Sequence, residues 1–302
     1  MYVLSDISFR IQGKQILHRV SLTLQPGVFA AIVGPNGAGK SSLLKVMAQE
    51  HGHYTGRVTI NKKLSEAYTP KELSRVRAVM PQHATVQFAF SVEQIIALGR
   101  HAHLTTKKEN LKIVEEVMTL TKTIHLRERI YLTLSGGEKQ RVQLARVLAQ
   151  VWEETGFPRY ILLDEPTSSL DIAQQQNIFS LARHVCERNI GVLAIIHDLN
   201  QAVQYADELY FLRDGKIVIS GDAQQVFTKS NIEETFCCRV NVYRDPCNDC
   251  PYIIPEREGS KVRSTGDSLP RSIGDGRSTR DNLLQFAEEG QNRNGMKVNF
   301  DL

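Results

Sequence analysis

The sequence predicts an α/β fold in which a mainly parallel sheet carries helices on both faces. Three observations support this prediction. The apolar run Phe29–Val33 is typical of a strand that is buried on both faces. The glycine-rich residues 34–39 join that run to a helical pattern at Lys40–Met47. From Tyr160 to Ile219, apolar strands alternate with helical patterns, which is the order that a parallel sheet requires.

The N-terminal residues have the pattern of further strands. Apolar and polar side chains alternate over residues 7–11 and again over residues 20–24, just before the Pro26-Gly27 turn. A turn and a short strand follow at Gly56–Ile60. We therefore expect an N-terminal antiparallel β region that accompanies the main sheet.

The middle of the chain is helical. Apolar residues recur at helical spacing from Ser91 to about Leu126, and another helix follows Ser135-Gly-Gly137. These segments predict a helical subdomain, at about residues 88–155, inserted into the sheet.

The rest of the domain alternates between strands and helices up to about residue 255. We expect strands at 160–163, 192–196, 208–212 and 216–219, and helices at 174–188 and 199–206. After Pro255 the composition shifts to Gly, Ser, Arg, Asp and Asn. The sequence thus predicts one domain over residues 1–255 and a disordered tail over 256–302, with an interaction arm as the alternative for the tail.

Composition excludes several classes of protein. The chain has 302 residues, of which 41% are hydrophobic and 23% charged, as in globular proteins. No apolar run approaches the roughly 20 residues of a membrane span, and the start lacks the pattern of a secretory signal. The formal charge of +4 is too small to imply a nucleic-acid partner.

The cysteines and two histidines offer weaker signals. Four of the five cysteines lie in the C-terminal third, and we expect reduced thiols there rather than a zinc site: Cys237, Cys238, Cys247 and Cys250. We expect His101 and His103 to lie in a solvated loop rather than to bind metal or heme. Trp152 is predicted to pack beside the preceding helix.

One motif predicts a nucleotide site that holds ATP with Mg²⁺. The motif G-x-x-x-x-G-K-[ST], followed by a second serine, is formed by Gly34, Pro35, Asn36, Gly37, Ala38, Gly39, Lys40, Ser41 and Ser42. Glycines let backbone N–H groups surround phosphate oxygens, and the N-terminus of the following helix favours negative charge. Lys40 would contact the β- and γ-phosphates, and the Ser41 hydroxyl would bind Mg²⁺.

Two later strands end in polar residues suited to the same site. Asp164 follows Ile161-Leu-Leu163 and would supply a second Mg²⁺ contact. Glu165 comes next and, on an extended backbone, would point elsewhere and act as general base on a water. His197 follows the strand at 192–196, where a sensor of the γ-phosphate belongs.

Together with Leu134-Ser-Gly-Gly-Glu138 and Lys139-Gln-Arg141, these motifs resemble the ATPase subunits of ABC transporters over residues 1–255. The resemblance implies that Gln82 contacts Mg²⁺ and the attacking water and faces a membrane subunit. It also implies a head-to-tail dimer, in which a second copy contributes residues to each nucleotide site in trans: Ser135, Gly136, Gly137 and Asp171. From the sequence alone, Ser135 and Glu138 also form a helix capping box.

Finer features resemble the heme (hemin) importers, among them the Arg141–Gln150 helix and the link through Trp152. That resemblance implies two membrane-spanning permease subunits, a periplasmic heme-binding protein as an indirect partner, and a place on the cytoplasmic face of the bacterial inner membrane. Siderophore or cobalamin import, a soluble ABC ATPase and a nucleotide-regulated binding module are the alternatives. Ile11 stands where many relatives carry an aromatic that stacks on adenine, so Phe9, Tyr2 or apolar packing would take that role.

Overall fold

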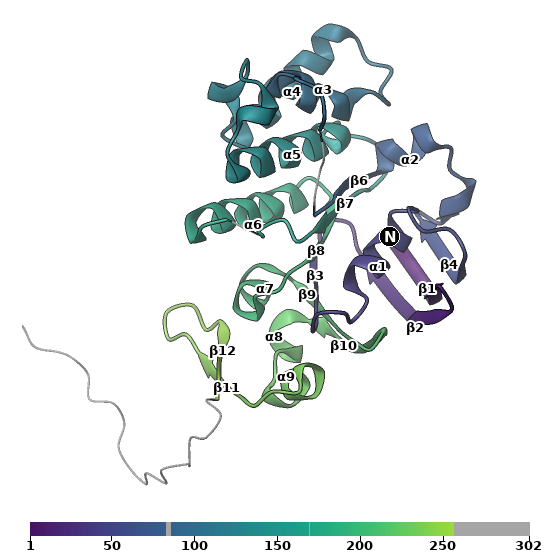
Figure 1. The fold of residues 1–302 in the computed structure, drawn as a ribbon, viewed down its shortest axis with the longest axis vertical. Coiled ribbons are helices and arrows are strands. Elements are labelled where there is room, and N and C mark those ends of the chain that lie inside the picture. The colour runs from purple at the N-terminus through teal and green to yellow at the C-terminus, as the bar shows by residue number, and fades with distance from the viewer. Residues whose placement is uncertain (83–85, 169, 257–302) are drawn as a thin grey trace, which may run out of the picture. The chain divides into compact units, whose positions relative to one another are not determined.

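A six-stranded sheet forms the centre of the fold, in the order β10-β9-β3-β8-β7-β6 (Figure 1). Its strands are β3 (Phe29–Val33), β6 (Arg77–Met80), β7 (Arg159–Asp164), β8 (Ile190–Ile195), β9 (Glu208–Arg213) and β10 (Lys216–Asp222). All pairs are parallel except β9 with β10. Every residue of β3, β7 and β8 is buried. The predicted fold class is confirmed.

The structure is a computed structural model, and it describes residues 1–82, 86–168 and 170–256. The tail that the sequence predicts falls on residues outside this described part, except for Glu256.

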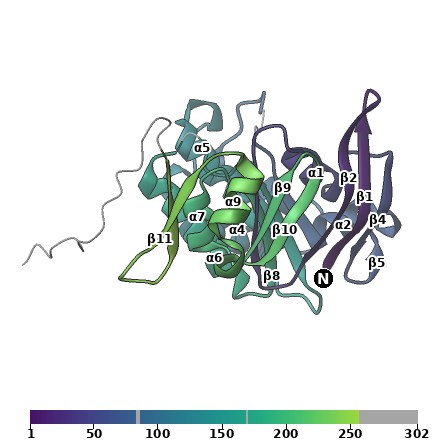
Figure 2. The same ribbon diagram turned by 90° about the horizontal axis from the view of Figure 1, so that it is seen from below.

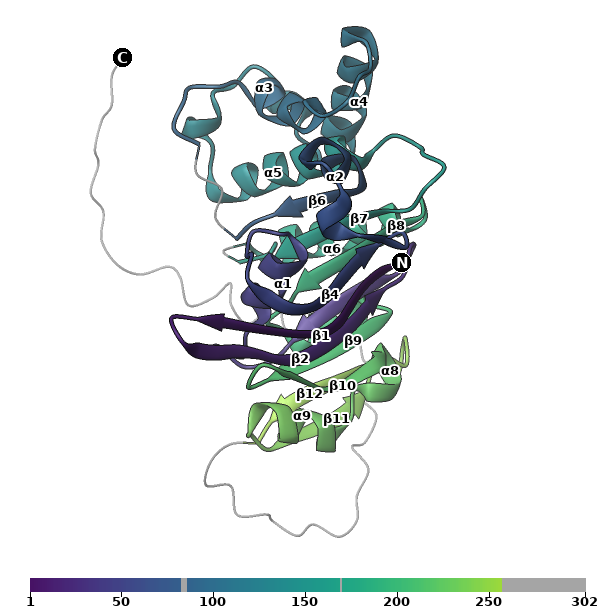
Figure 3. The same ribbon diagram turned by 90° about the vertical axis from the view of Figure 1, so that its right-hand side faces the viewer.

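A second sheet, with the order β2-β1-β4-β5, contains only antiparallel pairs, as the sequence predicts. Its strands are β1 (Tyr2–Ile11), β2 (Lys14–Leu24), β4 (Tyr54–Ile60) and β5 (Lys63–Leu64). Together with helix α1 (Lys40–Met47), this sheet packs on one face of the central sheet (Figure 3). Ala30 and Ile32 of β3 face that side, whereas Phe29, Ala31 and Val33 face the other. The period of two along a strand thus divides the core into two layers.

The other face of the central sheet is covered by helices α3 to α7. Their bounds are α3 (Val92–Ala97), α4 (Lys107–Leu120), α5 (Gly136–Val151), α6 (Ile172–Cys186) and α7 (Leu199–Tyr205), with 3₁₀ turns at Leu98–Arg100, Ile124–Leu126 and Tyr131–Thr133. Helices α3, α4 and α5 gather at the top of Figure 1. Each of these three begins with a capping box, in which a Ser or Thr and a Glu or Gln bond reciprocally.

Several elements were not predicted. Between β5 and β6 lie a 3₁₀ turn (Ser65–Ala67) and helix α2 (Pro70–Val76). After β10 come α8 (Ala223–Val226), α9 (Lys229–Phe236) and a hairpin of β11 (Val240–Arg244) and β12 (Pro251–Pro255), which Figure 2 shows beside α7 and α9. Among the described residues, no helix combines the length and the apolar character needed to cross a bilayer.

The side chain of Asn200, on α7, bonds to the hairpin at one residue of its outer edge. Its amide accepts from the N–H of Ile253 at 2.8 Å and donates to the C=O of the same residue at 3.4 Å.

The hairpin also separates the cysteines. Cys237 and Cys238 precede β11, whereas Cys247 and Cys250 lie near its turn, and in the part of the chain described no three ligands gather as a metal site would require.

Candidate nucleotide and catalytic site

Residues 34–39 connect β3 to α1 and, with Lys40 and Ser41 at the start of that helix, form the loop that the motif predicts. Gly34 is required by close approach, because a Cβ there would stand 2.0 Å from the carbonyl oxygen of Leu212. Gly39 caps α1 with φ of 101°, in the left-handed region that favours glycine. The loop thus turns sharply from a buried strand into a helix N-terminus, an arrangement that suits phosphate binding.

Lys40 folds back over this loop. It is only 6% exposed, and its Nζ donates to the carbonyls of Gly34 at 2.7 Å and Pro35 at 2.9 Å. Burial lowers the pKa of the Lys40 ammonium, while Glu165 and Asp164 oppose that shift. The cation is therefore held at the loop by two neutral carbonyl oxygens.

Asp164 ends β7 beside the first turn of α1. The hydroxyl of Ser41 donates to its Oδ1 at 3.3 Å, and the carboxyl group is 5% exposed. Burial raises the pKa of Asp164, and the Ser41 hydrogen bond opposes that shift. A carboxylate and a hydroxyl at this short separation are oxygen donors of the kind that Mg²⁺ prefers, so these residues fit the ion.

Glu165, Gln82 and His197 come together at the carboxyl ends of three neighbouring strands. Oε2 of Glu165 accepts from Nε2 of Gln82, and Oε1 contacts Nε2 of His197, both at 2.5 Å. Gln82 follows β6, Glu165 follows β7 and His197 follows β8. Because these strands are adjacent and parallel, their ends meet at one edge, as the sequence predicts for Asp164 and His197.

The conformation of Glu165 differs from the expected one. The sequence predicts an extended backbone, but φ at Glu165 is +50°, in the left-handed region. This turn, rather than strand alternation, directs the side chain away from Asp164 and towards Gln82 and His197. A non-glycine residue held in this region is uncommon and costs about 1–3 kcal/mol, which the surrounding structure must supply.

Ser135, Gly136, Gly137 and Asp171 occupy the first turns of α5 and α6. Ser135 and Glu138 form the predicted capping box, and Asp171 caps α6 by accepting from the N–H of Gln174 at 2.8 Å. A Cβ on Gly137 would stand 2.3 Å from the amide oxygen of Gln174, so the two helix starts lie close together. Within residues 1–82, 86–168 and 170–256, no hydrogen bond or ion pair joins these four residues to Lys40 or Glu165.

Gln140 belongs to a motif named above, but no contact was predicted for it from the sequence. Its Nε2 donates to the carbonyl of Pro166, which follows Glu165, and so links α5 to the loop that holds the candidate base. The available signal was helical spacing, because Gln140 lies three residues after Gly137 and therefore on the same face of α5.

Two of the three alternatives for contacting adenine are wrong, and so is the expectation for His103; apolar packing against adenine stays a prediction. Phe9 is 5% exposed and stacks on His51, and Tyr2 is fully buried against Tyr160, so both belong to the core and neither offers a face to adenine. His103 is buried rather than solvated: Nδ1 contacts Glu153 at 2.9 Å and Nε2 contacts the Gln150 carbonyl at 2.8 Å. Burial is the main reason that the pKa of His103 lies below its usual value.

Ile11 and Trp152 remain to be placed. Ile11 is 39% exposed. The predicted packing of Trp152 is confirmed, since it is 6% exposed and belongs to the core on the helical face of the sheet.

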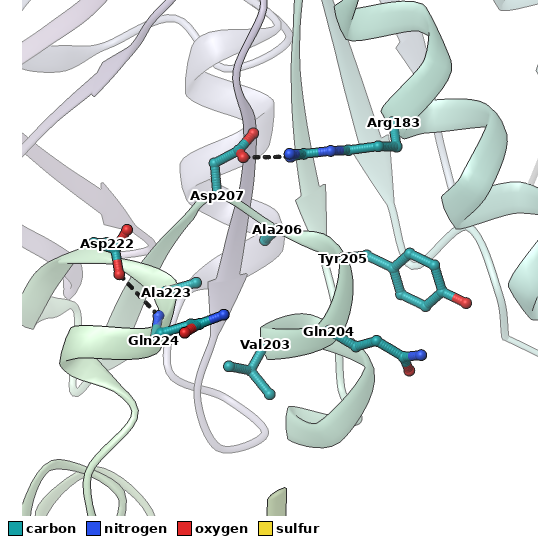
Figure 4. A pocket seen from close by; sticks show the side chains of 9 residues that line it. All are labelled: Arg183, Val203, Gln204, Tyr205, Ala206, Asp207, Asp222, Ala223 and Gln224. Carbon is teal, nitrogen blue, oxygen red and sulfur yellow. Dashed lines mark hydrogen bonds and ion pairs between the residues drawn. The ribbon is translucent and has the colours of Figure 1, made fainter. Parts of the chain in front are cut away.

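A cavity of about 490 Å³ lies at the opposite, amino edge of the sheet, between α6, α7 and α8 (Figure 4). Its charged side chains already have protein partners. Asp207 pairs with Arg183 and accepts from the N–H of Phe29 at 2.9 Å, and Asp222 caps α8. Groups satisfied in this way attract no phosphate, so the cavity is not the nucleotide site.

Comparison with known proteins identifies the relatives of this chain. Residues 17–168 match the family described as ABC transporter. The hemin import ATP-binding protein HmuV of Gloeobacter violaceus is 44% identical over 268 residues, which are 88% of this chain and 97% of that protein. The protein of the same name from Rhizobium meliloti is 41% identical over 254 residues, 83% of this chain and 97% of that one.

Solved structures show the same fold. An ATP-binding cassette of an ABC transporter in its ADP conformation superposes with a TM-score of 0.67 at 23% identity, over 78% of this chain and 97% of that chain. A dimeric bacterial ABC transporter cassette gives 0.64 at 24% identity, over 74% of this chain and 99% of that chain.

Proposed function

This chain belongs to the ABC transporter family, and we propose that it is the ATP-hydrolysing subunit of a hemin importer at the cytoplasmic face of the bacterial inner membrane. One observation carries the enzymatic part of the proposal: Gln82, Glu165 and His197 converge at the sheet edge next to Lys40. A phosphate loop, a carboxylate base and a histidine at one edge are what attack of water on a γ-phosphate requires.

Residues 34–42 would hold the phosphates of ATP. Lys40 would exchange the carbonyls of Gly34 and Pro35 for β- and γ-phosphate oxygens, since an ammonium bonds more strongly to an anionic oxygen than to a neutral carbonyl. Ser41, Asp164 and Gln82 would hold Mg²⁺, which neutralises phosphate charge when bound.

Glu165 would take the proton of the attacking water. In the structure its two oxygens contact Gln82 and His197, so one contact must open to admit the water. His197 is 45% exposed. Once free of Glu165, it would donate to the γ-phosphate.

A second copy of the chain would complete the site. Ser135, Gly136, Gly137 and Asp171 make no contact with Lys40 of their own chain within the described residues, yet Ser135 begins a helix whose N-terminus favours anions. They would face the γ-phosphate bound to the other copy. One of the similar structures above is itself a dimeric cassette.

The permease subunits would dock on the helical part. A groove of about 600 Å³ lies between α3 and α4, and its apolar walls include Phe90, Leu98 and Leu111. Phe88 and Leu98 nearby are 69% and 53% exposed. Through this groove, closure of the dimer would act on the membrane partners, and a periplasmic hemin-binding protein would join indirectly.

Replacing Glu165 by Gln tests the enzymatic assignment. Glu165→Gln removes the base but keeps the shape of the side chain, so we expect ATP-dependent dimers that turn over at least about a hundredfold more slowly, in keeping with the usual contribution of a general base. Analytical sedimentation measures the dimer, and phosphate release measures the rate of ATP hydrolysis. Glu128→Gln, an exposed carboxylate with no ion pair in the described part, is the matched control. Ordinary turnover by Glu165→Gln would exclude the assigned role.

The cargo requires a separate experiment. The chain is purified with its native membrane partners, and ATP hydrolysis in liposomes is compared with hemin-loaded, siderophore-loaded and cobalamin-loaded binding protein. We expect stimulation by hemin alone. Stimulation by another cargo would change the substrate and leave the enzyme assignment in place.

A further inference from the structure

A cavity of about 330 Å³ lies where α2, the segment after Arg100 and the connection between α5 and β7 meet. It is at the amino edge of the sheet, because β7 begins at Arg159 and reaches the nucleotide site only at its other end. Leu104, Val151 and Phe157 form apolar walls, and the guanidinium groups of Arg75 and Arg159 also line it.

Neither of these two arginines forms an ion pair in the part of the chain that the structure describes. Arg159 is 3% exposed, and it donates to the carbonyls of Val151 at 2.8 Å and Arg188 at 3.0 Å, while its buried Nε lacks a partner. Burial and the neighbouring Arg188 lower the pKa of Arg159, and the smaller influence of Glu154 and Glu153 opposes that shift.

Arg75 has free donors beside this buried cation. Its Nε donates to the carbonyl of Ala102 at 2.8 Å, and within the described residues its two terminal nitrogens have no hydrogen-bond partner. Arg75 is a half-buried residue and lines the cavity.

The acid that lines the cavity is already engaged. Oε1 of Glu153 pairs with the buried Arg100, and Oε2 contacts Nδ1 of His103 at 2.9 Å. Both oxygens of Glu153 are therefore engaged by other side chains, and among the described residues Arg75 and Arg159 keep their positive charge without a carboxylate partner.

We propose that this cavity binds a small amphipathic carboxylate, with its anionic head on Arg75 beside Arg159 and its apolar body against Leu104, Val151 and Phe157. Guanidinium groups are the preferred partners of carboxylates, and a mostly apolar wall with few polar groups is typical of small-molecule sites. Inorganic phosphate would satisfy the arginines but leave the apolar walls uncovered.

The position of the cavity makes this binding separable from that of ATP. Val151 ends α5, and Gly136 begins it, so the 16-residue helix runs about 24 Å from the predicted trans residues to the cavity. A ligand at the far end of α5 contacts the helix but none of the residues assigned to ATP.

The single tryptophan of the chain reports on this cavity. Trp152 stands between two lining residues, Val151 and Glu153, and the guanidinium of Arg188 lies 4.1 Å from the centre of its ring. Its fluorescence is measured in the full chain without nucleotide, during titration with octanoate below micellar concentrations. Two control ligands are titrated in the same way. Acetate has the carboxylate but not the apolar chain of octanoate, and 1-octanol has the apolar chain but not the carboxylate.

We expect a saturable change in fluorescence with octanoate and an affinity at least about tenfold lower for the two controls. Octanol loses the charge-assisted hydrogen bond, and acetate loses the burial of the apolar chain, and each contributes at least this much. Equal affinities for octanoate and octanol would overturn the proposal. A fluorescence titration with octanoate that shows no saturable change would also overturn it.

Two variants keep the test specific. Arg75→Gln should weaken octanoate binding about tenfold, the contribution of one charge-assisted bond. Lys71→Gln removes an exposed charge from the same helix and should leave the binding unchanged. Phe157→Ser, at the rim, should weaken octanoate more than acetate. Equal affinities in Arg75→Gln and Lys71→Gln would also contradict the proposal, and circular dichroism verifies that each variant is folded.

Discussion

The two edges of the central sheet hold their polar side chains in different ways. At the carboxyl edge, Glu165 contacts two other side chains, and Lys40 bonds to carbonyls of its own loop. At the amino edge, Asp207 accepts from the first N–H of β3, and Arg159 donates to carbonyls at and just after the end of α5. We expect the contacts at the carboxyl edge to be exchanged for a ligand when ATP binds, and these contacts at the amino edge to hold the fold. Four substitutions test this contrast.

The largest effect is expected at the carboxyl edge. Lys40→Ala removes the cation that would bind two phosphates, and ATP affinity should fall about a hundredfold or more, because each charge-assisted bond contributes about 1.5–3 kcal/mol. Titration with a fluorescent ATP analogue measures the loss. Lys45→Ala, on the same helix but exposed, is the control and should bind normally. Unchanged affinity in Lys40→Ala would remove this residue from the site.

At the amino edge, removing a buried cation should affect the free energy of unfolding and leave ATP binding unchanged. Arg159→Met leaves buried carbonyls without donors, so we expect a loss of about 3 kcal/mol in the free energy of unfolding. Denaturant titration measures it, with Arg244→Met on the exposed hairpin as the control. ATP affinity of the folded variant should stay normal. A loss of ATP affinity without a loss of stability would show that Arg159 serves the nucleotide site and not the fold.

At Ser135, a role in helix stability and a role in ATP hydrolysis can be distinguished in one residue. Ser135→Ala and Thr106→Ala each remove a helix cap, and each should cost about 1 kcal/mol of stability. Only Ser135→Ala should also slow ATP hydrolysis, since the proposal places this hydroxyl at the γ-phosphate of the other copy. Equal ATPase rates in the two variants would leave Ser135 with a capping role alone.

The smallest effect is expected for Asp207→Asn. The amide oxygen can still accept from the N–H of Phe29, so the variant loses mainly its ion pair with Arg183, which is half exposed. Such pairs contribute less than about 1 kcal/mol. Thermal and denaturant unfolding should barely change, and ATPase activity should be normal. A large loss of stability would show that this pair matters more to the amino edge than its exposure suggests.

The sequence predicts the carboxyl edge well because its signals are local. A strand, a glycine loop and a helix follow one another at residues 29–47, and Asp164 and His197 are placed by the strands that precede them. Parallel pairing then brings these ends together without further information.

The amino edge and the hairpin were not predicted because they depend on contacts between distant residues. Nothing in the local sequence marks Arg159 as buried, because its partners lie at the end of α5 and beyond. The sequence predicts that His103 is solvated, but the structure places it against Glu153. The backbone of Glu165 escaped prediction for a different reason, since no residue pattern marks a non-glycine residue for positive φ.

Asn200 gives the hairpin a property that its own two strands lack. Its amide presents a donor and an acceptor to the N–H and C=O of Ile253, and so acts as one residue of a third strand. The outer edge of β12 is thereby closed at that point against pairing with another chain, a protection that exposed edges need. Asn200 lies only three residues after His197, so the short segment 197–200 carries both the histidine of the candidate site and the side chain that closes this edge.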